Sequence, residues 1–65
     1  MLQPRIRLKM WLAEKEIRQG TFAQMIGVSF HVVSNILTGR TKPTPDVAQA
    51  IERETRGAIK TAEWV

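Results

Sequence analysis

Apolar residues near the start of the chain recur at intervals of three and four, the spacing that brings side chains to one face of a helix. Pro4 opens this segment, and proline suits a first helical position because its missing N–H would have no partner there. The pattern predicts a first helix from Pro4 to about Glu16. Its main apolar stripe comprises Ile6, Met10, Ala13 and Ile17, and it is broadened by Leu8, Trp11 and Leu12. We interpret so wide a stripe as core together with a partner surface.

A short second helix is predicted ahead of Gly27, because glycine adopts the left-handed backbone of a helix end without strain. Its apolar face comprises Phe22, Ala23 and Ile26. Residues 21–24 have the form of a capping box, but a start there leaves only about a turn and a half. We therefore place the start of this helix near Gln19.

The third helix is predicted over about residues 30–38, with Gly39 at its end. Ser29 stands where a side-chain oxygen can cap the open N–H groups of the first turn. Val28 and Val33 occupy the two positions of a hydrophobic staple.

A basic loop, residues 40–43, leads to a fourth helix whose start is marked by Thr44 as cap, Pro45 and the first-turn acid Asp46. Its apolar positions are Val47, Ala50 and Ile51, and we expect a last turn near Glu54 closed by Gly57. In the tail, residues 58–60 could be extended and residues 61–65 could form one capped turn.

The connection between the second and third helices predicts a tight corner of the helix-turn-helix kind, because two helices this short cannot pack antiparallel. At about 100° per residue, Val33, Ile36 and Leu37 share the inner face of the third helix. Its outward face carries no charge and comprises Phe30, His31, Val32, Ser34 and Asn35. Such a face is unlike a solvated helix surface, so we expect a partner to cover it.

Double-stranded DNA is the partner that this chemistry favours. Asparagine can bond both N6 and N7 of adenine, serine suits several bases, and valine or phenylalanine can contact a thymine methyl group. Arg18, Arg40 and Lys42 bracket the face, as contacts to phosphates require. The formal charge of +4, from ten basic and six acidic residues, agrees with DNA binding but does not establish it.

Each of these residues also has an ordinary interpretation. His31 could be a simple surface histidine, and Phe30 could tuck against the second helix as core. The basic residues of the first helix are interpreted as its solvated face, namely Arg5, Arg7, Lys9 and Lys15. The specific signal is the order and spacing of the whole segment.

That segment, residues 19–43, reads QGTFAQMIGVSFHVVSNILTGRTKP. It resembles the Cro and phage-repressor type of helix-turn-helix family, whose pattern is Gln, two residues, Leu-Ala, three residues, Gly-Val-Ser, three residues, Val-Ser, Ile and a Gly-Lys or Gly-Arg turn. The matching residues are Phe22-Ala23, Gly27-Val28-Ser29, Val33-Ser34, Ile36 and Gly39-Arg40, in register without a gap.

The resemblance implies an all-α, lambda-repressor-like domain of four or five helices over residues 1–65, often dimeric on a near-palindromic operator. It implies base contacts from Phe30, His31 and Asn35, with Ser29 and Val32 nearby. It implies phosphate contacts from Gln19, Thr38, Arg40 and Lys42.

Three positions depart from the family pattern. Many members pair an arginine in the first helix with a glutamate in the third, where this chain has Leu12 and Leu37. Arg18 replaces a common serine or threonine cap, and Glu16 stands where glycine is common, so the first corner could differ.

The short chain leaves no room for a ligand-sensing domain, so the sequence favours a Cro-like repressor of phage or prophage type that dimerises. A candidate dimer surface is formed by Ile59, Trp64 and Val65, the alternative being that Trp64 covers the core of its own chain. Another function is an antitoxin or other protein-binding module anchored by Trp11, Phe30 or Trp64. A further alternative function is nonspecific binding of nucleic acid.

An enzyme is not expected, because one histidine, no cysteine and no evident carboxylate pair leave little for acid–base or metal chemistry. We expect no cofactor, metal or small-molecule ligand. Without a membrane span, a signal peptide or cysteines, the sequence predicts a cytoplasmic protein of a bacterial or phage-infected cell.

Overall fold

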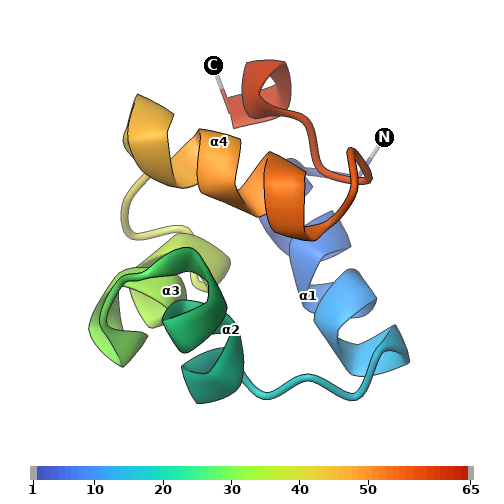
Figure 1. The fold of residues 1–65 in the computed structure, drawn as a ribbon. Helices are drawn as coiled ribbons and strands as arrows, with labels where there is room; N and C mark the ends of the chain where they lie inside the picture. Colours follow the sequence, from blue (N-terminus) through green and yellow to red (C-terminus); the bar gives the residue numbers. More distant parts are fainter. Residues whose placement is uncertain (1, 65) are drawn as a thin grey trace.

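Four α-helices and a final 3-10 turn make up the fold, and the computed structural model describes residues 2–64 (Figure 1). The elements are α1 (Pro4–Glu14), α2 (Gln19–Ile26), α3 (Phe30–Leu37), α4 (Pro45–Glu54) and the 3-10 helix η1 (Thr61–Trp64). The predicted all-α class is confirmed, and no strand occurs among these residues. None of the helices in the described part is long and apolar enough to cross a membrane.

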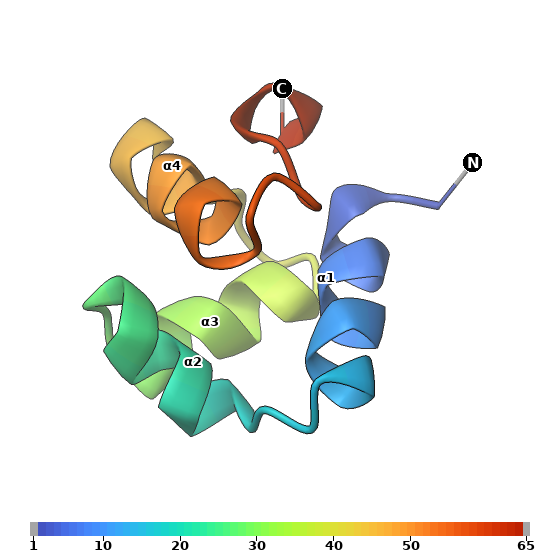
Figure 2. The same cartoon turned by 45° about the vertical axis from the view of Figure 1, so that its right-hand side comes forward.

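The third helix lies at the centre of the packing. It contacts both α1 and α2, while α4 contacts α2 and η1. The core that results draws on every element: Leu8, Leu12, Phe22, Ala23, Ile26, Val33, Ile36, Leu37, Ala48, Ala50, Ile51, Ile59 and Trp64. Figure 2 shows α1 at one side of the molecule and the corner between α2 and α3 at the opposite side.

The face of α1 that turns inward differs from the one predicted. Leu8 and Leu12 are buried, whereas Met10 is 55% exposed and Ala13 is exposed. The helix has two apolar sides, since residues 8 and 12 lie on the side opposite Ile6 and Met10 at about 100° per residue. Spacing alone cannot decide which of two such sides packs inward, and the helix also ends two residues earlier than expected.

All four α-helices end in the same way, by the Schellman pattern of two backbone hydrogen bonds. In α1 the N–H of Ile17 bonds to the carbonyl of Leu12 at 2.9 Å and that of Glu16 to Ala13 at 3.2 Å. The residue that turns the chain has a positive φ each time, and it is Gly27 after α2 and Gly39 after α3. After α1 it is Glu16, at φ 56°.

The end of α4 corrects the expectation that Gly57 closes this helix. The closing residue is Arg56, at φ 55°, whose N–H bonds to the carbonyl of Arg53. Gly57 follows, also at positive φ, and its N–H reaches the carbonyl of Glu52 at 2.8 Å. Two consecutive left-handed residues reverse the chain and send the tail back toward α1.

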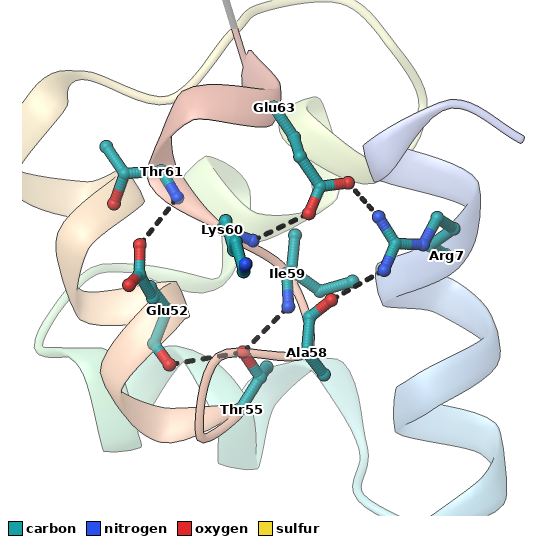
Figure 3. Close-up of polar contacts among 8 residues, drawn as sticks. All are labelled: Arg7, Glu52, Thr55, Ala58, Ile59, Lys60, Thr61 and Glu63. Atoms are coloured by element: carbon teal, nitrogen blue, oxygen red, sulfur yellow. Dashed lines mark hydrogen bonds and ion pairs between the residues drawn. The ribbon is translucent and has the colours of Figure 1, made fainter.

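The tail is fastened to α1 and α4 by side-chain hydrogen bonds (Figure 3). The guanidinium of Arg7 donates to the carboxylate of Glu63 and, at 2.6 Å, to the carbonyl of Ala58. The second oxygen of Glu63 accepts from the N–H of Lys60 at 2.9 Å, as in half of a capping box. From α4, the carboxylate of Glu52 accepts from the N–H of Thr61 at 2.7 Å.

The tail residues predicted as a dimer surface are buried within the single chain. Ile59 is 2% exposed and Trp64 is 8% exposed, both within the core of the single chain. Val65, the third residue of that candidate surface, lies outside the described residues. Trp64 therefore covers its own core, and it is not available as an anchor for another chain or for a protein partner.

Candidate nucleic-acid interface

The corner between α2 and α3 is built by backbone hydrogen bonds around Gly27. Its φ of 75° allows the N–H of Val28 to bond back to the carbonyl of Ala23 at 2.9 Å. The chain then enters α3 at Ser29, in the N-cap position that the sequence predicts. The hydroxyl of Ser29 makes no cap hydrogen bond, however, and the N–H of Val32, which such a cap could engage, donates to the Ser29 carbonyl at 3.1 Å. That hydroxyl stays exposed at the start of α3.

The two faces of α3 divide as the sequence predicts. Its inner side chains, Val33, Ile36 and Leu37, are each no more than 2% exposed. On the outward face Phe30 is 51% and Val32 is 37% exposed, and His31 is exposed as well. Ser34 and Asn35 are half-buried. The structure therefore brings the predicted base-contacting side chains together on one side of one helix.

The polar side chains of this outward face have no hydrogen-bond partner in the described part of the chain. Among residues 2–64, no hydrogen bond involves the side chain of His31, Ser34 or Asn35. The imidazole, hydroxyl and amide are therefore free to exchange hydrogen bonds with water for hydrogen bonds with base edges.

Phe30 stands where the first turns of α2 and α3 meet. A methyl group in place of the Gly20 hydrogen would lie 3.9 Å from its Cδ1, and its ring is edge-on to His31 at 6.0 Å. Since Phe30 is 51% exposed, it is not the core residue that the alternative interpretation offered.

The predicted phosphate contacts lie at the ends of the two helices. Arg18 is exposed at the N-cap of α2, where no side chain caps the first N–H groups, and Gln19 begins the helix. Open N–H groups at a helix start favour an anion, and the positive charge of Arg18 adds to that preference. Arg40 and Lys42 are exposed beyond the end of α3.

Thr38 is exposed, but its hydroxyl already has an acceptor. It donates to the carbonyl of Ser34 at 3.0 Å, one turn back in α3. A bond from Thr38 to a phosphate would require this hydroxyl to rotate away, so its contribution is weaker than that of the cations.

Arg5 is a neighbour of this site that the sequence does not reveal. A side chain at Gly39 would meet the Nε of Arg5 at 3.0 Å, which places the guanidinium against the turn that ends α3. The sequence assigned both Arg5 and Arg7 to the solvated face of α1, yet both are half-buried. No local pattern signals such contacts, because they join residues far apart in the chain.

The charge around the corner is of one sign. No aspartate or glutamate occurs in residues 17–45, which include α2, α3 and the loops around them. All six acidic residues lie outside this stretch. A phosphate backbone approaching the corner therefore meets cations and neutral groups from this segment, which favours nucleic-acid binding.

Two eight-residue helices at a tight corner, with an uncharged outward face on the second, define a helix-turn-helix domain. Residues 8–57 match the family model described as Helix-turn-helix. The chain therefore belongs to this family, of the Cro and phage-repressor type, and is a DNA-binding helix-turn-helix domain of the regulatory class. No curated protein and no solved structure matches the chain.

The departures from the family pattern now have a structural description. Leu12 and Leu37 are 4% and 1% exposed, so an apolar contact region occupies the place where other members have an ion pair. Exchanging a buried pair of charges for apolar groups is often neutral or stabilising. Glu16, in place of a common glycine, adopts the left-handed conformation that glycine would adopt more easily.

Proposed function

We propose that this protein is a sequence-specific transcriptional regulator of the Cro-like repressor type, of phage or prophage origin. It binds a near-palindromic operator as a dimer, with the outward face of α3 in the major groove. The observation that supports this most strongly combines two features of the corner. The outward face of α3 is uncharged and its polar side chains have no hydrogen-bond partner among residues 2–64, and cations lie at both ends of the corner.

The roles divide by chemistry. Asn35, one turn after His31, is the side chain that can bond an adenine through two atoms at once. Phe30 and Val32 offer apolar surface to thymine methyl groups, and Ser29, His31 and Ser34 supply hydrogen bonds to other base edges. Arg18, Gln19, Arg40 and Lys42 hold phosphates and fix the position of α3, and Thr38 assists them.

Two substitutions separate base recognition from phosphate binding. Asn35→Ala should cost about 1–3 kcal/mol on the preferred duplex and relax the preference at one base pair. Arg40→Ala should weaken binding to preferred and shuffled duplexes alike, and should reduce the slope of log affinity against log salt by about one. Fluorescence anisotropy titrations at several salt concentrations measure both effects.

Lys60→Ala is the matched control, since Lys60 is an exposed cation in the tail, away from the corner. It should change the salt slope less than Arg40→Ala does. If Asn35→Ala and Arg40→Ala shift every duplex by the same amount, α3 does not recognise bases.

A further inference from the structure

The side chain of Arg5, in the first turn of α1, lies against the turn that ends α3. A Cβ atom at Gly39 would be 3.0 Å from the Nε of Arg5, 3.3 Å from its Cδ and 3.4 Å from its Cζ. Any other residue at position 39 would therefore have to displace the guanidinium. Figure 2 shows α1 beside the last turn of α3, and the two helices are in contact.

The positive charge of Arg5 has no carboxylate partner in the described part of the chain. Neither of the two ion pairs found there includes Arg5. Its Nε donates to the side-chain oxygen of Gln3 at 3.0 Å, which orients the guanidinium without neutralising it. Its terminal N–H groups make no hydrogen bond with residues 2–64. A half-buried guanidinium in this state is ready to bind an anion.

A hollow joins Arg5 to the loop that follows α3. Its lining includes Arg5 from α1 and two exposed residues of the loop, Thr41 and Lys42. No hydrogen bond with residues 2–64 involves the side chain of either loop residue. Glu63 also lines the hollow, but its charge is compensated by the ion pair with Arg7.

The groups around this hollow fit a phosphate. Arg5 and Lys42 are like charges that repel each other, and an anion between them would turn this repulsion into attraction. A guanidinium can donate two parallel hydrogen bonds to phosphate oxygens, lysine adds a compact charge, and the hydroxyl of Thr41 can donate another hydrogen bond. The loop directly follows α3, so a duplex that receives α3 in its major groove brings its backbone phosphates to this side.

We propose that Arg5 binds a backbone phosphate of the duplex together with Lys42, so that α1 takes part in DNA binding at the end of α3. This assignment rests on the proposed function, because it requires a duplex along the outward face of α3. Arg18 lines a separate hollow with Ser29, at the start of α3. Cations would therefore hold the phosphate backbone at both ends of α3 and fix its position in the groove.

Salt-dependent titrations of the full chain test this role. Arg5→Gln should weaken binding to preferred and shuffled duplexes alike, by about three- to tenfold, and should reduce the slope of log affinity against log salt by about one. Arg5→Lys keeps the charge and should keep most of the slope. Arg53→Gln is the matched control, since Arg53 is an exposed cation in the last turn of α4, and it should leave the slope unchanged. Circular dichroism shows whether each variant is folded.

Neutral methylphosphonate groups, placed singly along the preferred duplex, identify the phosphate. At one position in each half-site, the replacement should weaken binding of the parent chain more than binding of Arg5→Gln, and the same position should respond to Lys42→Gln. An unchanged salt slope in Arg5→Gln, or equal losses for both proteins at every position, would overturn the assignment of Arg5. A parent chain that prefers no sequence would contradict the proposed function, while a lower slope for Arg5→Gln on shuffled duplexes would still support this assignment.

Discussion

Single residues at the helix ends determine how closely the four helices can turn on one another. The chain ends α2 and α3 with glycine, but ends α1 and α4 with Glu16 and Arg56 in the same left-handed conformation. A residue with a Cβ atom pays about 1–2 kcal/mol for this conformation. Both positions are therefore strained, and the turns persist because two backbone hydrogen bonds and the adjoining core hold them.

Replacing Glu16 by glycine should relieve this strain. We expect Glu16→Gly to raise the free energy of unfolding by about 0.5–1 kcal/mol, less than the full strain because glycine also loses more backbone entropy on folding. Urea unfolding followed by circular dichroism measures the change.

Two controls isolate the conformational effect. Glu16→Gln removes the charge and keeps the strain, so it should leave the stability close to that of the parent chain. Gly27→Ala should lower the free energy of unfolding, because alanine is strained at the φ of 75° that Gly27 adopts. No atom lies within 4 Å of the added Cβ, so the change reports the backbone conformation and not a steric clash. A loss of stability in Glu16→Gly would show that this position is not strained.

The carboxylate of Glu52 joins α4 to the tail, and protonation of this carboxylate weakens the contact. The backbone N–H of Thr61, bonded to Glu52 at 2.7 Å, lowers the pKa of that carboxyl below its ordinary value of 4.5. The hydroxyl of Thr61 and the charge of Lys60 add to the lowering, and desolvation opposes it. Because the folded pKa is the lower one, this contribution to stability is present above about pH 4.5 and is lost as the pH falls through the folded value.

Removal of the Glu52 carboxylate should change how the stability of the protein depends on pH. Glu52→Gln should be less stable than the parent chain at pH 7, and the difference should shrink as the pH falls below 4.5. Thermal unfolding between pH 7 and pH 2.5 checks this, with Glu16→Gln as the control. A difference that does not change with pH would mean that the Glu52 carboxylate is not engaged by the tail.

The elements also show how far the sequence predicts this fold. The ends of α2 and α3 and the start of α4 follow from local signals, namely Gly27, Gly39 and Thr44-Pro45. The outward face of α3 follows from periodicity, because only one side of that helix is apolar without interruption. Periodicity does not predict the inward face of α1, because α1 is apolar on two sides. Local signals do not predict the path of the tail either, since Arg7 and Glu63 are 56 residues apart in the chain.

In the whole molecule, α1 and the corner between α2 and α3 lie on different sides (Figure 2). The acid-free stretch, residues 17–45, includes that corner, so the outward face of α3 and the cations beside it belong to one segment of positive charge.

Selection of tightly bound duplexes from a random pool at physiological salt shows whether the outward face of α3 recognises base edges. We expect one short motif to be enriched and to occur twice as a near-palindrome, with about 34 Å between the two half-sites. The same selection with Asn35→Ala should lose the preference at one position of each half-site. Recovery of unrelated sequences with no common motif would mean that α3 does not recognise bases.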